Sequence, residues 1–308
     1  MKVYNNIDDV NISERTAVAM GYFDGMHLGH QALIRMTVQT AITSGLKSVV
    51  FTFRDNPKNL LSSNSAVKSI LSHEDKARLM DTAGIDYMIS VPFDDRIRNL
   101  APRQYIRLLL DKNINMTAVC CGFNYRFGKD AAGDKELLQA MGAAEGFEVS
   151  IVKPYTIDGN VVSSSLIRNL ISDGDMAACK TFLGRYYTAS GKVVSGNRLG
   201  RTIGFPTVNI MIDEDMLTPP HGVYVTACHI GDQTYRGVTN VGIKPTIGDG
   251  KKSVETHLFD VDQDLYEKRI IVEFFKMIRE ERRFENLDAL AVQIEKDCRI
   301  ARAYHSNL

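Results

Sequence analysis

The hydrophobic pattern of this chain changes its period partway along, and this change constrains the fold more than any other feature. From Thr16 to about Gly184, short runs rich in β-branched residues alternate with helical patterns. The helical run 30–46, for example, precedes the strand-like run 48–53. Such alternation predicts a parallel sheet with crossover helices. Beyond about Arg185 the strand-like runs follow one another directly, which predicts an antiparallel β-barrel.

A helix is predicted at the end of the chain, after the last strand-like run. Apolar residues recur there at intervals of three and four and form one stripe, which consists of Leu287, Leu290, Ile294, Cys298 and Ala301. This stripe predicts a helix that packs against the barrel. With 308 residues, of which 44% are hydrophobic, the chain is long enough for two substantial cores.

The charge balance argues for small-molecule partners. Lys plus Arg and Asp plus Glu number 37 each, so no overall field attracts the protein to nucleic acid or to anionic lipid. No apolar stretch approaches the roughly 20 residues of a membrane span. We therefore expect neither a nucleic-acid partner nor a membrane partner.

The cysteines and the N-terminal residues indicate the cytoplasm. The chain has five cysteines, an odd number without C-x-x-C spacing, which suits reduced thiols better than a disulfide framework. We expect these cysteines to pack in the core. The first residues, MKVYNNIDDVNISE, are too polar for a signal peptide. The expected location is therefore cytoplasmic.

Two histidines lie three residues apart in the stretch AMGYFDGMHLGHQALI, residues 19–34. If the apolar run before Asp24 is the first parallel strand, the turn extends to Gly29 and His30 begins the next helix. His27 and His30 then lie near a helix N-terminus at the carboxyl edge of the sheet, a place that binds phosphate. Two imidazoles there can donate hydrogen bonds to a triphosphate and stabilise the charge that develops during nucleotidyl transfer. For a bare H-x-x-H, a helix that happens to start with histidines, or a pair of metal ligands, are the alternatives.

The whole string GYFDGMHLGH, residues 21–30, resembles the signature of the nucleotidyltransferase superfamily with the H-x-G-H motif. Two further stretches resemble the second and third adenylyltransferase motifs of the bacterial bifunctional riboflavin kinase/FAD synthetase family: CGFNYRFGKDAAGD at 121–134 and VSSSLIR at 162–168. The C-terminal half resembles a riboflavin kinase. Its motifs appear in the family's order as GKVVSGNRLGRTIGFPTVNI, PPHGVYVT, GVTNVGIKPT, VETHLFD and IREERRF. Tyr22 departs from the pattern, because many members have Asn at this position.

This resemblance implies a fold and two reactions. Residues 1–184 would form a Rossmann-like FMN adenylyltransferase domain, and residues 185–308 a riboflavin kinase β-barrel with a C-terminal helix. The second domain would transfer the γ-phosphoryl group of ATP to riboflavin, giving FMN and ADP. The first domain would transfer AMP from a second ATP to FMN, giving FAD and pyrophosphate. The implied cofactor of both steps is Mg²⁺; an oligomer is compatible with the sequence.

In the first domain the resemblance assigns roles around the triphosphate of ATP. It implies that His27 and His30 act on the ATP phosphates and that Asn124 helps to position metal and phosphate. The other phosphate-binding residues that it implies are Asp24, Gly25, Gly29, Ser164, Ser165 and Arg168. A Ser-rich turn that opens a helix supplies N–H groups and hydroxyls, and arginine adds a fork of donors suited to phosphate. Without the family context, the serines are a plain N-cap and Asp24 only braces the loop.

In the second domain the resemblance makes Thr207 and Asn209 ligands of Mg²⁺, in a motif whose Gly204 and Thr207 also bind phosphate. Side chains two apart on a strand share a face, and Mg²⁺ takes few protein oxygens. The resemblance makes Glu255 the base that accepts the proton of the riboflavin 5′-hydroxyl. It makes Arg279 part of a flavin-covering loop. The alternatives are a structural β-turn for the first motif, a solvated strand carboxylate for the glutamate and a charged surface segment for the arginine.

Two other functions fit part of the sequence. The H-L-G-H string alone suits an aminoacyl-tRNA synthetase-like activation domain, but no K-M-S-K-S string follows and the balanced charge gives tRNA little electrostatic help. A flavin-binding regulator would keep the fold while one or both active sites are inert. The candidate residues of both sites argue against the regulator, and an assay for ADP and pyrophosphate separates the two functions.

Overall fold

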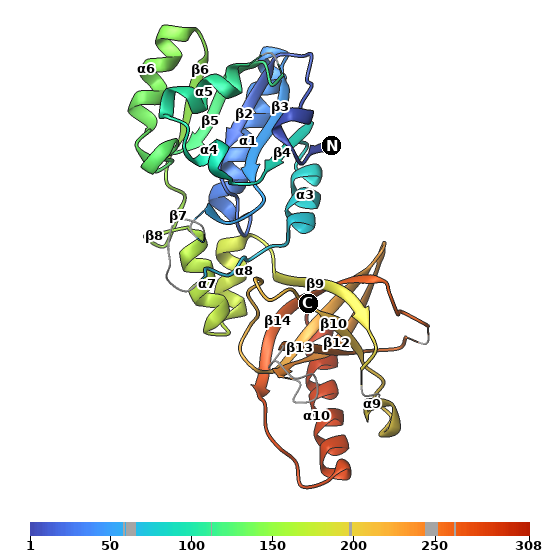
Figure 1. Ribbon diagram of the computed structural model, residues 1–308. Helices are drawn as coiled ribbons and strands as arrows, with labels where there is room; N and C mark the ends of the chain where they lie inside the picture. Colours follow the sequence, from blue (N-terminus) through green and yellow to red (C-terminus); the bar gives the residue numbers. More distant parts are fainter. Residues whose placement is uncertain (58, 60–65, 112, 197–198, 244–251, 262) are drawn as a thin grey trace. The chain divides into compact units, whose positions relative to one another are not determined.

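The computed structural model describes residues 1–57, 59, 66–111, 113–196, 199–243, 252–261 and 263–308. These residues divide into two compact units, whose helices and strands are labelled in Figure 1. The first unit contains Met1–Ser69 and His73–Ser163, and the second contains Ile70–Ser72 and Ser164–Leu308. The division of the two activities between residues 1–184 and 185–308 stays a prediction, because compactness does not say where each reaction takes place.

A six-stranded sheet forms the centre of the first unit, with the strand order β1-β4-β3-β2-β5-β6. Its strands are β1 (Lys2–Tyr4), β2 (Thr16–Met20), β3 (Lys47–Phe53), β4 (Tyr87–Val91), β5 (Met116–Gly122) and β6 (Glu148–Val152). Every pairing is parallel, which confirms the predicted sheet. The chain runs outward from β2 through β3 and β4, then crosses to β5 on the other side. The topological switch point therefore lies between β2 and β5, where ligands of such sheets bind.

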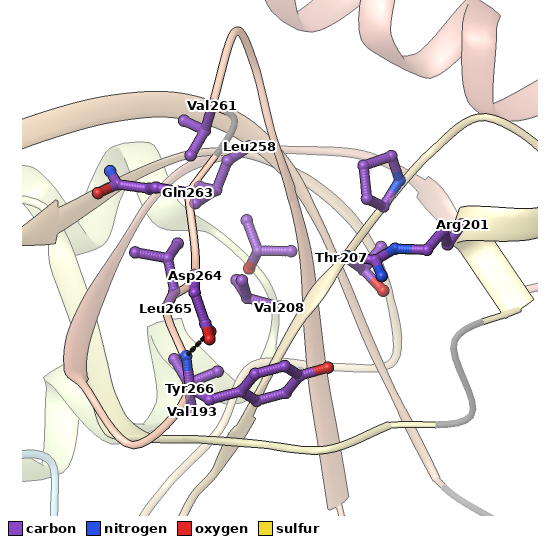
Figure 2. Close-up of a pocket in the computed structure, with 12 residues that line it drawn as sticks. Val193, Arg201, Thr207, Val208, Leu258, Val261, Gln263, Asp264, Leu265 and Tyr266 are labelled. Carbon is purple, nitrogen blue, oxygen red and sulfur yellow. Dashed lines mark hydrogen bonds between the residues drawn. The ribbon is translucent and has the colours of Figure 1, made fainter.

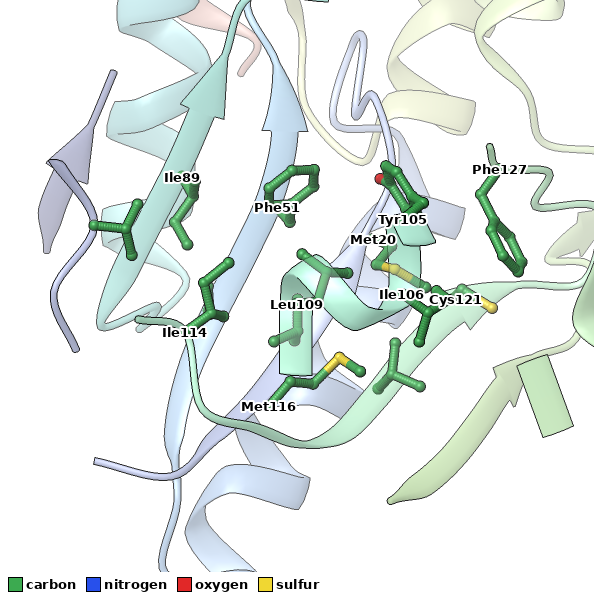
Figure 3. Close-up of a cluster of buried hydrophobic side chains, with 14 of the residues drawn as sticks. Met20, Phe51, Ile89, Tyr105, Ile106, Leu109, Ile114, Met116, Cys121 and Phe127 are labelled. Atoms are coloured by element: carbon green, nitrogen blue, oxygen red, sulfur yellow. The ribbon is translucent and has the colours of Figure 1, made fainter. Parts of the chain in front are cut away.

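Helices cover both faces of this sheet. Because side chains alternate along each strand, the two faces carry different sets of side chains. Large side chains of the strands, such as Met20 and Phe51, pack under α5 (Pro102–Leu110) through Ile106 and Leu109, as Figure 3 shows. The opposite face has smaller residues next to α1 (Leu28–Ser44). There, Ala17 and Ala118 of the strands pack against Ala41 of α1. The remaining elements of the unit are η1 (Ile7–Asp9), α3 (His73–Thr82), α4 (Asp95–Arg98), η2 (Lys129–Ala131), α6 (Lys135–Glu145), β7 (Thr156–Ile157) and β8 (Asn160–Val161).

The second unit contains a closed six-stranded barrel, with the order β10-β13-β12-β11-β14-β9. Its strands are β9 (Tyr187–Val194), β10 (Val208–Met211), β11 (Gly222–Ile230), β12 (Gln233–Ile243), β13 (Lys252–Leu258) and β14 (Arg269–Glu280). All the pairings are antiparallel, as predicted. A short helix, α9 (Leu199–Thr202), precedes β10.

The last helix, α10 (Leu287–Ser306), packs against the barrel as expected. Cys298 and Ala301 are buried in one cluster with Val223 and Phe275 of the barrel strands. Leu287, however, is 47% exposed, so its place in the predicted apolar stripe was wrong. It is the first residue of the helix, one turn before the part of α10 that reaches the barrel.

Two helices that the sequence analysis placed with the first domain belong to the barrel unit. They are α7 (Ser164–Ser172) and α8 (Met176–Leu183). Ile171 and Leu183 are fully buried in one cluster with Tyr187 and Phe274 of the barrel. These helices therefore complete the core of the barrel unit.

Three threonine hydroxyls form a buried chain across adjacent barrel strands. Thr226 of β11 is hydrogen-bonded to Thr239 of β12 at 2.8 Å, and Thr239 to Thr256 of β13 at 2.7 Å. The three side chains are at most 1% exposed. Each hydroxyl satisfies its neighbour in a place where an unpaired polar group would be costly. The chain therefore ties together the strands that carry the barrel's candidate site.

All five cysteines are buried and unpaired, as predicted for cysteines that pack in the core. Burial raises the pKa of the Cys121 thiol to about 12. Among the residues described above, no helix combines the length and the apolar character needed to cross a membrane.

Candidate functional site

The histidine motif lies where β2 ends, at the switch point of the parallel sheet. Helix α1 begins at Leu28, and His27 is its N-cap: the Nδ1 atom of His27 accepts a hydrogen bond from the His30 backbone N–H at 3.3 Å. The prediction that His30 begins the helix was therefore wrong. The imidazole of His27 does the capping that Ser or Asp usually does, so the helix starts earlier.

The two imidazoles stack, with ring centroids 3.6 Å apart and planes inclined by 18°. Burial, together with the nearby His27 and Lys76, holds the pKa of His30 well below its usual range. His30 is therefore a neutral imidazole at physiological pH. Because Nδ1 of His27 accepts a hydrogen bond, a neutral His27 carries its proton on Nε2. The pair is set up to donate hydrogen bonds without carrying two adjacent positive charges.

The loop that precedes these histidines has a strained backbone. Phe23 and Met26 have positive φ angles of 56° and 43°, which bulky residues rarely adopt, and Gly25 between them has a φ of 82°. Phe23 is fully buried, and its ring meets the His30 ring edge-on at 5.4 Å. Asp24 is only 2% exposed. Burial of the two large apolar side chains stabilises a loop conformation that the backbone alone disfavours.

A buried lysine contacts the same loop. The Nζ atom of Lys76, from α3, donates to the Tyr22 carbonyl oxygen at 2.8 Å and lies 4.2 Å from the centre of the Tyr22 ring. The Thr52 hydroxyl donates to the same carbonyl at 3.2 Å. The sequence analysis missed Lys76. Lys76 lies four residues before Met80, so the two side chains share the buried face of α3 (His73–Thr82).

A cavity of about 730 Å³ opens beside the histidine loop and contains predicted residues from two strand ends. His30 follows β2, and Asn124 follows β5. Half of the other lining residues are aromatic or basic, and the sequence analysis gave none of them a role: Tyr22, Phe23, Phe53, Phe93, Arg98, Tyr105, Tyr125, Arg126, Phe127 and Lys129. A cavity with flat aromatic walls and cationic groups suits a planar, phosphorylated ligand.

Much of the second motif is structural. Gly128 has a φ of 71°, and a Cβ there would lie 2.7 Å from the Cα of Pro102, so only glycine fits. Asp134 is the N-cap of α6, where its Oδ1 accepts from the Leu137 N–H at 2.9 Å. Packing and capping therefore account for these residues, whereas Asn124 faces the cavity.

The boundary between the two compact units falls within the third motif: Val162 and Ser163 belong to the first unit, and the motif from Ser164 onward belongs to the second. Ser164 and Ser165 are the first residues of α7, as predicted, and Arg168 is half-buried in its second turn. Gly29, by contrast, is in the first unit, as the second residue of α1. The closure of Ser164, Ser165 and Arg168 on the triphosphate stays a prediction.

Glu255 occupies the middle of β13 and is half-buried. In the strand register it lies opposite Asn209 of β10 on one side and Asn240 of β12 on the other. The Ser253 hydroxyl donates to Oε1 of Glu255 at 3.1 Å. The carboxylate lines a cavity of about 320 Å³ whose other walls include Ile203, Phe205, Thr207, Val223, Asn240, Arg279, Phe284, Leu290 and Ile294. Most of the surface of this cavity is apolar, although His257, Glu281, Arg282 and Asp297 also line it.

A second cavity of the barrel unit, of about 690 Å³, contains Arg201, Thr207, Thr256, Asp264 and Tyr266. Figure 2 shows Arg201 and Thr207 on one side of this cavity and the segment from Gln263 to Tyr266 on the other. Thr207 lines both cavities of the unit. Gly204, with a φ of 86°, is in the turn just before Thr207. The sequence analysis found the Thr207 motif but missed the facing segment.

Arg279 lies on β14, so the prediction that it belongs to a loop was wrong. Its Nη2 and Nε atoms donate to Oδ2 of Asp297 on α10 at 2.8 and 3.0 Å. Asp297 is 1% exposed and also accepts from Nε2 of Gln293 at 2.8 Å. This bidentate pair fixes the guanidinium at the cavity wall and joins α10 to the site. The flavin-binding role of Arg279 stays a prediction.

Replacing Asp297 by Asn should lower both stability and kinase activity. The variant keeps the volume but takes the carboxylate away from the half-buried Arg279 guanidinium, and loss of one partner of a fully buried pair costs about 3–5 kcal/mol, an upper bound here. Chemical denaturation gives the free energy of unfolding, and FMN formation gives the activity. Asp260→Asn is the matched control, because Asp260 pairs with Arg302 at the exposed surface. Equal effects of the two variants would contradict this role of Asp297.

Comparisons with known proteins agree with these two units. The family model described as FAD synthetase matches residues 9–166, and the one described as riboflavin kinase matches residues 183–305. A bifunctional riboflavin kinase/FMN adenylyltransferase of Bacillus subtilis is 34% identical over 299 residues, covering 96% of this chain and 94% of the relative. Its Escherichia coli K12 counterpart is 34% identical over 307 residues, covering 99% and 98%.

A solved structure has the same fold over nearly the whole chain. It is a crystal structure from Streptococcus pneumoniae described as a macrolide-efflux protein, with a TM-score of 0.86 and 31% identity. The match covers 97% of this chain and 98% of the other.

A parallel sheet with an H-x-G-H loop at its switch point, joined to a closed barrel with a glutamate-bearing cavity, defines a nucleotidyltransferase linked to a small-molecule kinase. Both halves are matched by their own family models. The chain belongs to the bifunctional riboflavin kinase/FAD synthetase family. It phosphorylates riboflavin to FMN and adenylylates FMN to FAD, with ATP as co-substrate of both reactions.

Proposed function

We propose that riboflavin phosphorylation takes place where the two cavities of the barrel unit meet. The observation that carries this proposal is that Thr207 lines both cavities. Riboflavin would occupy the smaller, mostly apolar cavity with its 5′-hydroxyl at Glu255. ATP would occupy the larger cavity between Arg201 and Tyr266, with its γ-phosphate at Thr207. The 5′-oxygen then attacks the γ-phosphorus, and ADP leaves on the opposite side.

Glu255 would accept the proton of the 5′-hydroxyl as the new O–P bond forms. The hydrogen bond from Ser253 at 3.1 Å helps to fix the carboxylate at the wall of this cavity. Arg279, held by Asp297, would form the wall that covers the flavin. The register of β13 between two asparagine-bearing strands keeps Glu255 at this wall.

Thr207 and Asn209 fit the Mg²⁺ that the kinase reaction is expected to use. Both offer neutral oxygen ligands, and Asn209 is 6% exposed, with the backbone of Gly196 packed directly against its amide. When bound there, Mg²⁺ would neutralise charge on the phosphate oxygens of ATP. Asn124 offers a similar side-chain oxygen beside the adenylyltransferase cavity. Gly204 would let the backbone approach the phosphates.

Adenylyl transfer would take place in the 730 Å³ cavity of the first unit. The flavin ring of FMN would lie among its aromatic side chains, and a phosphate oxygen of FMN would attack the α-phosphorus of ATP. The bond to the β-phosphate then breaks and pyrophosphate leaves. His27 and His30 would donate hydrogen bonds to the phosphates as charge develops. Asp24, Gly25 and Gly29 would shape the loop around the triphosphate, and Ser164, Ser165 and Arg168 would be further phosphate-binding residues.

The decisive experiment is to incubate the protein with riboflavin, ATP and Mg²⁺ and to separate FMN from FAD by chromatography. ADP must appear with FMN, and pyrophosphate with FAD. Addition of EDTA in excess over Mg²⁺ should stop both. A protein that binds flavin but releases neither ADP nor pyrophosphate would be a flavin-binding regulator instead.

The two activities should separate when the chain is divided. A fragment from Ser164 to Leu308 should make FMN but no FAD, because it contains the whole barrel and both of its helices α7 and α8. A fragment of residues 185–308 should be less stable, because it uncovers Tyr187 and Phe274. Burial of a large side chain contributes roughly 1.5–3 kcal/mol. Thermal unfolding ranks the fragments. A folded Ser164–Leu308 fragment that cannot phosphorylate riboflavin would refute the separation.

We also propose that the protein acts in the cytoplasm, without nucleic-acid or membrane partners. The equal numbers of basic and acidic residues support this. An oligomer is compatible with these proposals, and light scattering of the purified protein would measure its state.

A further inference from the structure

Lys76 is the most deeply buried cation near the adenylyltransferase loop. It is 2% exposed, on the inner face of α3. A buried ammonium needs compensation, because desolvation of a charge is costly. Here it donates to the Tyr22 carbonyl at 2.8 Å, and the face of the Tyr22 ring lies 4.2 Å away. Both contacts are with the residue that starts the strained stretch of the loop.

The charged groups around Lys76 come from three elements. Asp24, in the loop, is also buried, and its charge favours the ammonium. His30, on α1, and His73, on α3 itself, each have a pKa that is lowered mainly by burial and further by Lys76. Burial lowers the pKa of Lys76 to about 8, so at neutral pH it is mostly charged. Its charge is lost as the pH rises through this value.

The chemical need for a cation at this place follows from the loop itself. Phe23 and Met26 hold positive φ angles, so the loop has a tendency to relax into ordinary backbone conformations. An ammonium that binds the Tyr22 carbonyl opposes this relaxation at the start of the loop. The same charge disfavours protonation of His30, which keeps that imidazole a neutral donor.

We propose that Lys76, in its charged form, is a positioning residue for adenylyl transfer that holds the Tyr22–Met26 loop in the geometry that aims His27 and His30 at the ATP phosphates. It acts through the Tyr22 carbonyl and does not contact the reacting atoms. This inference rests on the proposed function, which places adenylyl transfer at the histidine loop.

The first test uses the wild-type protein and the pH dependence of kcat/KM for ATP at saturating FMN and Mg²⁺. This parameter reports the pKa values of the enzyme before ATP binds. It should be level from pH 6.5 to about 7.5 and fall above about pH 8, because the charged form of Lys76 is lost there. A level profile up to pH 9.5 would overturn the proposal.

Two variants then separate positioning from packing. Lys76→Met keeps the length of the side chain without charge, and kcat/KM at pH 7 should fall on the order of 10–100-fold, as for loss of a charge-assisted hydrogen bond. Lys76→Arg retains the charge at every pH tested. Its activity at pH 7 should be restored toward wild type, and its alkaline fall should disappear. An Arg variant with the wild-type fall, or a Met variant as active as wild type, would overturn the proposal.

The control variant is Lys47→Met, because Lys47 is half-exposed and pairs with Asp86 at the start of β3. It should keep the wild-type pH profile. The variant His30→Ala distinguishes failure of the proposed function from failure of the proposed role of Lys76. If this variant retains adenylylation, the proposed function fails; if it loses adenylylation while the Lys76 variants match wild type, only the role of Lys76 fails.

Discussion

Replacing Glu255 by Gln is expected to lower the kcat of riboflavin phosphorylation by on the order of 10²–10⁴, which is the usual contribution of a general base. Glutamine keeps the volume and can still accept the hydrogen bond from Ser253, but it cannot take the proton of the 5′-hydroxyl. Riboflavin binding should weaken far less. The measurement is ADP release at saturating riboflavin, ATP and Mg²⁺, so that weaker binding is not mistaken for slower chemistry.

The same variant should adenylylate FMN at the wild-type rate, since Glu255 and the histidine loop belong to different compact units. Glu273→Gln is a matched control: this glutamate of β14 contacts His229 at 3.2 Å and lines neither barrel cavity. If the Glu255→Gln enzyme phosphorylates riboflavin at the wild-type rate, Glu255 is not the general base. Another group, or the phosphate of ATP, would then have to accept the proton.

The variant His30→Ala should lose most FAD formation from FMN, by roughly 10²–10³ in rate, as when one preorganised donor to developing charge is removed. Its effect should hardly vary between pH 6.5 and pH 8. The reason is that the pKa of His30 is held well below its usual range, so the imidazole is neutral throughout this interval.

The kinase activity of the same variant, measured as FMN formation from riboflavin, provides the internal control for His30→Ala. This rate should stay near that of the wild type, because His30 lines neither of the two barrel cavities described above. Equal loss of both activities in a variant that keeps its fold would mean that the two reactions share a site.

The sequence predicts the fold of each half well, because its signals are local. Period-two and period-three-to-four patterns give the strands of the sheet, the barrel and α10. The sequence gives no comparable signal for β1, since Lys2–Tyr4 is too short and too polar for a strand pattern. The assignment of α7 and α8 to the barrel unit was also beyond local patterns. It depends on which core buries their apolar faces, and the periodicity of a helix does not identify its partner.

Some residues of the candidate sites can likewise be predicted from local motifs, and others cannot. Motifs identify His30, Asn124 and Glu255, because residue type and spacing carry their chemistry. Lys76 and Asp297 escape such reasoning, because a lysine or an aspartate in a helix is usually solvated. Only the three-dimensional packing shows that each is almost fully buried and bound to a residue of the site.

The chain of threonine hydroxyls across the barrel has a consequence for the register of β13. Neighbouring residues of β13 serve different cavities: Glu255 faces the smaller one and Thr256 the larger one. A slip of β13 by a single residue would exchange them, turn Val254 and Leu258 out of the core and remove the carboxylate from the smaller cavity. Only the native pairing brings Thr239 opposite Thr256, so that both buried hydroxyls are satisfied. The hydroxyl chain therefore adds to the burial of Val254 and Leu258 in fixing the register of β13, and with it the place of Glu255 at the smaller cavity.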